Sequence, residues 1–455
     1  MTVGITCYGG VNEIGGNKIL ISDGDTRVLL DFGAGFSEGL DYFSSGIEAR
    51  RVNGAGDYFE FGLLPELPGL YSEDALQNTD LKYASPEIDA IVLSHYHSDH
   101  MGRISLIDQE IPVYCGETTA LIHKASSESG GSSLDGRDVR TFRTGDRFRV
   151  GGIEIQPMHV DHSIPGAYGF ILQTSEGPVV YTGDYRFHGP MGSMTDDFIA
   201  QAQMAKPLAL ITEGTRVSAG DRKQEMGESE VAEQTTMLLN ANPRLVFSSF
   251  RGNDIDRVLS FYKACQATGR RLVVSMKVAI LLDELKNDSG MKVPEIGRDV
   301  SVYLRRKGKG SYDDADYYKW ERRFLDHSFT AEEVRKQQNQ VLLHLDQWYL
   351  PELIDIKPEK GGAYIHATTE AYNEEGEQDE QVIRNWVGHY GFEYHQIHAS
   401  GHAPMEKVGD LVNRIGAQKV IPVHTARPDL FSKLAKKGKV QMPVKGKRMS
   451  LSLGT

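Results

Sequence analysis

Residues 94–102, SHYHSDHMG, place three histidines and one aspartate within six residues. His95 and His97 are two residues apart, so on an extended chain they share a face and can bind one metal ion. A turn can then bring Asp99 and His100 to a second ion. A run of surface histidines is the alternative, but with 15 histidines in 455 residues the pattern arises by chance roughly once in a thousand such chains. The spacing therefore predicts a site for two neighbouring metal ions.

Two ions need more ligands than one loop provides, and three further candidates follow apolar strands elsewhere in the chain. They are His162 in DHSIPG, Asp184 in TGDYR and His424 in IPVH. Each alone is equally well explained as an ordinary polar residue of a loop or core. Asp184 is suited to bridge both ions, and the histidine-rich set favours zinc, although mixed His/Asp ligation also admits manganese. Two divalent ions about 4 Å apart activate water, so the set predicts hydrolytic chemistry.

The first 212 residues, which must position this site, show the pattern of many short strands separated by Gly or Pro turns. These strands are predicted at 3–8, 18–22, 26–30, 88–94, 113–115, 148–150, 153–158, 168–173 and 179–182. A short helix is expected at 104–109. Residues 36–84 have no clear period, so we expect a long, loop-rich excursion with at most a helical turn.

From about residue 213 the pattern changes to strands that alternate with amphipathic helices, which predicts parallel pairing. One β-α-β unit is expected from a strand at 244–248, a helix at 255–265 and a strand at 271–275. The highly charged residues 284–347 are predicted to be mostly helical. The other elements are expected at 373–381 (the start of a solvated helix), 405–415 (helix), 420–424 (strand) and 449–453 (strand).

The composition is that of a soluble globular chain, with 40% hydrophobic and 25% charged residues, and the length suggests at least two domains. Cys7, Cys115 and Cys265 are expected to be reduced and buried. No apolar run approaches the roughly 20 residues of a membrane span. The N-terminus does not have the pattern of a signal peptide, so the cytoplasm is the expected location.

The net charge of −13 argues against bulk attraction to nucleic acid, because nucleic-acid-binding domains are usually basic. A polyanionic partner must therefore meet a local basic path. Candidates for this path are Arg251, Arg257, Lys277 and the stretch RRKGK at 305–309. A solvated loop is the alternative interpretation of that stretch.

The order of Asp31 in LLDFG, the HxHxDH loop, His162, Asp184 and His424 resembles the metallo-β-lactamase fold. The resemblance implies an α/β protein built as an αββα sandwich, with Asp31 behind the metal ligands. The insertion before His424 resembles that of the β-CASP nucleases and has a Rossmann-like pattern. The sequences GGVNEIGGN, DHSIPGAYGF and HASGHA are most similar to the ribonuclease J branch. The implied domains are 1–212 and 391–455 for the metallo-β-lactamase domain and 213–390 for the β-CASP domain.

This resemblance implies a ribonuclease that acts on single-stranded RNA in RNA processing and decay. The family cuts from the 5′ end and often internally as well, uses two zinc ions, and commonly forms dimers or larger homo-oligomers. The implied catalytic residues are Asp99, Asp184, Glu213 and His402, and the implied metal ligands are His95, His97, Asp99, His100, His162, Asp184 and His424.

The resemblance also implies a pocket for the RNA phosphate, formed by Ser248, Ser249, Arg251, Ser400 and Gly401. Here Arg251-Gly252-Asn253 stand where the family has a small residue and Ser-Asn. An alternative is that Ser248 and Ser249 only cap the following helix.

Two other functions share parts of this sequence pattern. A small-molecule hydrolase acting on thioesters or lactams would use the same ligands, but it rarely needs an inserted domain of about 180 residues. An RNA-binding subunit with a degenerate site would lack some ligands, whereas every expected ligand is present in this chain.

Overall fold

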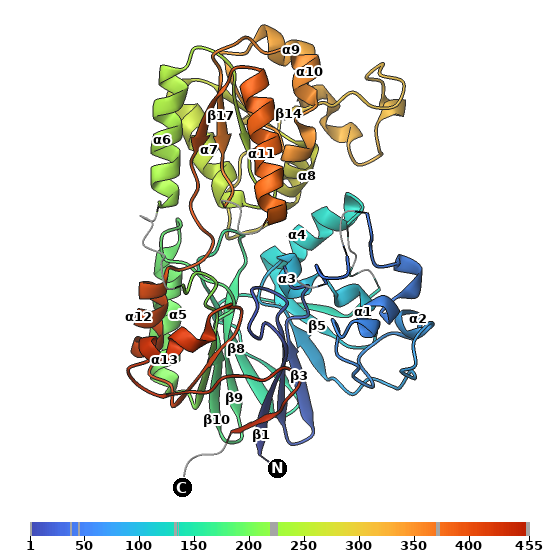
Figure 1. Ribbon diagram of the computed structural model, residues 1–455, viewed down its shortest axis with the longest axis vertical. Coiled ribbons are helices and arrows are strands. Elements are labelled where there is room, and N and C mark those ends of the chain that lie inside the picture. The colour runs from blue at the N-terminus through green and yellow to red at the C-terminus, as the bar shows by residue number, and fades with distance from the viewer. Residues whose placement is uncertain are drawn as a thin grey trace.

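The computed structural model describes residues 2–36, 39–43, 46–131, 134, 136–218, 226–369 and 374–451. Within them are three seven-stranded sheets, two of which face each other while the third forms a separate lobe (Figure 1). This is the predicted α/β architecture of an αββα sandwich with an inserted Rossmann-like domain.

The first sheet of the sandwich is antiparallel on one side and parallel on the other. Its order is β21 (Met449–Leu451), β1 (Val3–Gly9), β2 (Lys18–Asp23), β3 (Thr26–Leu30), β4 (Ala90–Val92), β5 (Val113–Gly116) and β6 (Val139–Phe142). The second sheet has the order β20 (Lys439–Val440), β19 (Lys419–Pro422), β11 (Ala209–Thr212), β10 (Gly177–Tyr181), β9 (Tyr168–Thr174), β8 (Ile153–His159) and β7 (Phe148–Val150).

The inner faces of these two sheets share one apolar core, which includes Ile5, Val92, Phe170 and Ile421. The outer face of the second sheet packs against α5 (Gly192–Ala205), α12 (Met405–Ile415) and α13 (Phe431–Leu434). Alternating apolar and polar residues along the strands allow one face to be buried against the partner sheet.

The described part of residues 36–84 covers the outer face of the first sheet. The sequence had suggested no role for this segment. They contain the short helices α1 (Gly56–Glu60), α2 (Glu73–Leu76) and η1 (Arg51–Asn53). Leu64, Leu70 and Tyr71 are buried there beside strand residues such as Ile91. This segment therefore forms an outer layer on the first sheet, whereas regular helices form the outer layer on the second sheet.

All pairings of the third sheet are parallel, in the order β15 (Ser328–Phe329), β14 (Val300–Tyr303), β13 (Arg271–Val274), β16 (Val341–His344), β12 (Val246–Ser249), β17 (Ala363–His366) and β18 (Glu393–Gln396). One face packs against α6 (Glu228–Ala241), α7 (Ile255–Thr268) and α8 (Met276–Leu285). The other packs against α9 (Ala331–Lys336), α10 (Glu352–Ile356) and α11 (Glu374–His389). The domain boundaries remain a prediction, and β18 lies beyond residue 390 in this sheet.

The prediction that residues 284–347 are mostly helical was wrong. They contain β14, β15, β16 and α9, together with the 3-10 helices η3 (Asp314–Asp316) and η4 (Arg322–His327). The apolar stretches at β14 and β16 are four residues long and fully buried. A buried parallel strand has no alternating pattern, so the charged flanks dominated the interpretation.

Smaller differences concern the edges of elements. The expected helix at 104–109 is the 3-10 helix η2 (Ile104–Leu106), and α4 (Glu117–Glu128) was not anticipated. Two further 3-10 helices are η5 (Gln347–Tyr349) and η6 (Pro428–Leu430). Residues 373, 452 and 453 of the expected elements lie outside the described residues. The three cysteines are free and buried, as predicted.

Candidate metal centre

The predicted ligands lie together at one edge of the sandwich, because each follows the carboxyl end of a strand. His95 and His97 follow β4, Asp184 follows β10 and His424 follows β19. β10, β11 and β19 are parallel neighbours, so their carboxyl ends meet at the same edge. α3 (Ser98–Met101) then carries Asp99 and His100 back toward that edge.

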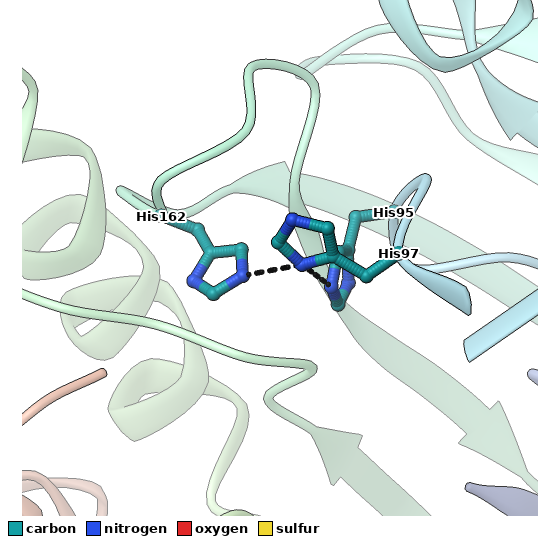
Figure 2. Close-up of side chains that lie close together, drawn as sticks. All are labelled: His95, His97 and His162. Atoms are coloured by element: carbon teal, nitrogen blue, oxygen red, sulfur yellow. Dashed lines mark hydrogen bonds between the residues drawn. The ribbon is translucent and has the colours of Figure 1, made fainter. Parts of the chain in front are cut away.

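Three histidines form the first half of the centre. Figure 2 shows the imidazoles of His95, His97 and His162 pointing toward one another. The Nδ1 atom of His97 lies 3.0 Å from Nε2 of His95 and 3.0 Å from Nε2 of His162. Burial lowers the pKa of His95 and His162 well below the usual value, and burial with nearby Arg251 lowers the pKa of His97 to about 4. All three rings are therefore neutral and able to bind a metal ion.

Two aspartates and two histidines form the second half. The Nε2 atom of His424 is 2.9 Å from Oδ2 of Asp99, and Nε2 of His100 is 3.1 Å from Oδ2 of Asp184. Burial opposes the charged imidazoles, but Asp184 and Asp99 more than offset it, so they raise the pKa of His100 and bring that of His424 to about 9. This half concentrates negative charge that favours a cation.

Asp184 stands between the two halves, as its predicted bridging role requires. Its Oδ2 atom lies 3.7 Å from Nε2 of His95, 4.0 Å from Nε2 of His162 and 3.6 Å from Nε2 of His424. Its Oδ1 atom is buried and has no hydrogen-bond partner. A buried carboxylate oxygen without a partner is costly, and a bound metal ion would satisfy it. The donor set therefore fits a bound metal.

Four of the histidines are oriented through Nδ1, which leaves Nε2 facing the centre. His100 donates to Asp31 at 2.8 Å, and His424 contacts the Thr215 hydroxyl at 2.8 Å. His162 donates to the carbonyl of Gly401 at 2.6 Å. His95 contacts the hydroxyl of Ser94 at 3.0 Å. Such partners fix the tautomer of a metal ligand and strengthen its binding.

Asp31, which the resemblance placed behind the metal ligands, lies beside His100. Besides His100 it accepts hydrogen bonds from the Ser94 amide and hydroxyl and from the Tyr181 hydroxyl, at 2.7 to 2.8 Å. Thr215 was not among the residues predicted for the site. The only signal for it was its place two residues after Glu213 at the end of β11.

Glu213 and His402 form a pair at the rim of the centre. The Nδ1 atom of His402 lies 3.0 Å from Oε1 of Glu213, and the ring is 20% exposed. Burial opposes the charged ring, but Glu213 and Asp184 more than offset it and raise the pKa of His402. Glu213 is itself fixed by the amides of Tyr185 and Thr215.

The five predicted phosphate-binding residues do not all lie together. Ser400 and Gly401 adjoin His402 and His162, whereas Ser249 and Arg251 line a separate cavity of about 320 Å³. Ser248 is fully buried and does not line that cavity, which contradicts the predicted contact. The helix-capping alternative is also wrong, because Asp254 caps α7.

A second buried charged group, which we call the junction cluster, joins the sandwich to the inserted domain. It contains two arginines and four acids: Arg186, Arg257, Asp161, Glu228, Asp254 and Asp256. Arg186 donates to the carbonyl of Ser400 and Arg257 to that of Ala399, two and three residues before His402. Arg257 is fully buried, so its predicted place on an RNA path was wrong.

Comparison with known proteins agrees with this geometry. Residues 67–247 match the family model described as "Beta-lactamase superfamily domain". This part of the chain is therefore similar to the domains of the β-lactamase superfamily. Its fold is close to the crystal structure of a protein of unknown function from Enterococcus faecalis V583, with a TM-score of 0.78 at 21% identity, covering 99% of this chain and 100% of that one.

The chain is also similar to several curated proteins named ribonuclease J. The protein from Sinorhizobium meliloti is 28% identical over 249 residues, which cover 52% of this chain and 40% of that protein. The protein from Mycobacterium tuberculosis is 27% identical over 302 residues, covering 62% of this chain and 47% of that protein. The matched region thus spans less than half of the length of either relative.

Proposed function

We propose that this protein is a metal-dependent ribonuclease that hydrolyses the phosphodiester bonds of RNA. The observation that supports this most is the convergence of seven ligand side chains beside the Glu213–His402 pair. The names of the curated relatives favour RNA over a thioester or lactam as the substrate. We further propose two zinc ions, with manganese as the substitute, and single-stranded RNA cut from the 5′ end and internally.

The ligand residues Asp99 and Asp184 would hold the two ions, which supply an activated water and neutralise charge on the phosphate. His402 is the proposed general acid. Its Nδ1 proton is donated to Glu213, so Nε2 is the atom that can give a proton to the leaving oxygen. The carboxylate of Glu213 favours the protonated ring and fixes its direction.

The proposed phosphate contacts are those that remain accessible. The Ser400 hydroxyl accepts from the His402 amide, so its own proton is available for a phosphate oxygen. Arg251 is exposed. Its guanidinium carbon lies 5.9 Å from the ring centre of Phe36, and this contact keeps the charge of Arg251 near the metal centre. Both would position a phosphate beside His402.

The test is to incubate the purified protein with 5′-labelled linear RNA, circular RNA and a chromogenic lactam, after metal removal and again after addition of Zn²⁺ or Mn²⁺. Metal-dependent cleavage of RNA without lactam turnover is expected. Lactam turnover without RNA cleavage would refute the proposal. Survival of the circular RNA would exclude internal cutting. Comparison of RNA that carries a 5′-monophosphate with RNA that carries a 5′-triphosphate shows which 5′ end is preferred.

Cleavage should also fall steeply with salt if the protein contacts RNA phosphates. No helix among the described residues is long and apolar enough to cross a membrane. A cytoplasmic location and a homodimer or larger homo-oligomer remain predictions.

A further inference from the structure

A cavity of about 480 Å³ lies in the inserted domain, apart from the metal ligands and from Glu213 and His402. It opens where β13, β14 and β16 end and where α8 begins. The end of α4 from the sandwich forms another side, and Figure 1 shows α4 next to the lower end of α8. Its volume is within the range of small-molecule sites.

The position of this cavity in the sheet is one where α/β folds bind ligands. β14, β13 and β16 are parallel neighbours, and the residues at or just after their carboxyl ends, Tyr303, Ser275 and His344, line the cavity. Crevices at the carboxyl ends of parallel strands are the usual ligand sites of α/β folds.

Aromatic rings make up much of the wall. They belong to Tyr303, Tyr317, Tyr318, Trp320 and Tyr349. Arg305 lies 4.1 Å from the ring centre of Tyr349, and Lys307 lies 5.1 Å from that of Tyr318. The hydroxyl of Tyr303 bonds Glu352 at 2.9 Å, which fixes that ring. Flat rings with cations beside them are suited to stack on a heteroaromatic base.

The cavity also has a positively charged end. Met276 and Lys277 are the first two residues of the ten-residue helix α8, so their amides precede the first intrahelical hydrogen bond. Lys277 is exposed, and among the described residues Asp346 is an acid that its charge acts on without a direct ion pair. A lysine at a helix N-terminus adds to the positive end of the dipole, which favours a bound phosphate.

A buried histidine supplies an independent indication of a ligand. His344 lines the cavity and is only 1% exposed. Its Nε2 atom donates to the carbonyl of Phe250 at 3.2 Å, so Nδ1 is an acceptor, and Nδ1 has no partner. Burial lowers the pKa of His344 to about 4, which keeps the ring neutral. An unpaired buried acceptor is costly, so a ligand with an N–H or O–H group would be favoured.

We propose that this cavity binds a nucleotide, with the base against the aromatic wall, the phosphate at Lys277 and the start of α8, and a donor group of the nucleotide on His344. The nucleotide is either free or one unit of an RNA chain. The RNA case rests on the function proposed above, whereas the free-nucleotide case does not.

The experiment is photo-crosslinking with 4-thiouridine, given either as free 4-thio-UMP or within a short single-stranded RNA. Labelled peptides are mapped by mass spectrometry, and RNA cleavage is measured in parallel. Label within 303–320 or 344–349 from either probe is expected. Label from free 4-thio-UMP alone identifies an effector site, and label from RNA alone identifies a substrate site. Absence of label there from both probes would overturn the proposal, whether or not the protein cleaves RNA.

Matched variants then test the role of the charge. Lys277→Glu should weaken the binding of UMP to the cavity, measured by displacement of the crosslink, by roughly tenfold or more. Lys263→Glu makes the same charge change on exposed α7 outside the cavity and should leave it unchanged. His344→Phe removes the hydrogen-bond acceptor and should also weaken the binding of UMP, measured in the same way. Equal affinity in Lys277→Glu and Lys263→Glu would reject the phosphate site.

Discussion

The metal centre and the junction cluster are both buried and highly charged, yet they are balanced in different ways. The junction cluster contains its own cations, because Arg186 and Arg257 pair with the four acids around them. In the metal centre only His95, His97 and His162 are neutral, and a buried oxygen of Asp184 has no partner. The difference indicates that the side chains of one cluster balance each other, whereas those of the other are suited to bind a metal from outside.

Removing the shared carboxylate tests the metal half of this comparison with the largest expected effect. Asp184→Ala should lose bound metal and all RNA cleavage, because both ions lose a ligand; His97→Ala should act in the same way. Metal content by mass spectrometry and cleavage of labelled RNA are the measurements. Asp197→Ala, an exposed aspartate of α5, is the control. Cleavage at the normal rate by Asp184→Ala would refute the assignment.

His402 should separate chemistry from metal binding. His402→Ala should keep its metal but cut RNA about 100- to 10,000-fold more slowly, because the proposed general acid is gone. Single-turnover cleavage and metal content measure the two effects. If this variant loses metal, His402 is a ligand, and the third group that it forms with His162 and Asp184 is then part of the metal site.

Removing one cation should break the junction cluster. Arg186→Met leaves Asp161 and Asp256 without their buried cation, so the free energy of unfolding should fall by about 3–5 kcal/mol. Urea unfolding measures it. Arg414→Met removes an exposed pair with Asp196 and should cost less than about 1 kcal/mol. Equal midpoints for the two variants would show that the junction cluster does not stabilise the fold.

Substitution of a residue that orients a metal ligand should have a smaller effect than substitution of the ligand itself. Asp31→Asn keeps the shape of the side chain but weakens its hold on the Nδ1 proton of His100. Zinc affinity should fall about 10- to 100-fold. A competition titration with a chelating dye measures this, with Asp25→Asn in an exposed turn as the control. Unchanged affinity would remove Asp31 from the site.

The stability that the junction cluster contributes should also depend on pH, through the titration of Asp254. Burial raises the pKa of Asp254 to about 6, so the folded state holds a proton that the unfolded state releases near pH 4. Stability from this group is present below pH 4 and is lost as pH rises through 6, by up to about 1.4 kcal/mol per pH unit. Asp254→Asn keeps the helix cap and should remove that loss. Parallel urea midpoints of both proteins from pH 4 to 6 would contradict it.

The same two clusters mark what a sequence can reveal. The side chains proposed as metal ligands could be singled out because donors in a short motif or directly after a strand leave a local pattern. The junction cluster was not, because Arg186 and Asp256 are 70 residues apart in sequence and each looks like a surface residue. Burial alone distinguishes them, and burial of a charge depends on partners that only the fold brings together.

The third sheet and the outer layer on the first sheet show a related limit of prediction from sequence. Four-residue buried strands such as β14 carry no period, so the charged residues around them were interpreted as helix. Residues 36–84 were recognised as irregular, but their covering of the first sheet depends on isolated residues such as Leu70 and Tyr71. Packing of single side chains is invisible to a periodicity argument.

The return of the chain to the sandwich has a consequence for its synthesis. β19 completes the second sheet and carries His424, and β21 pairs with β1, so both sheets need segments made after the whole inserted lobe. A ribosome that has finished the first 390 residues has therefore not yet made His424, so the proposed metal centre can be completed only after the inserted lobe has been synthesised.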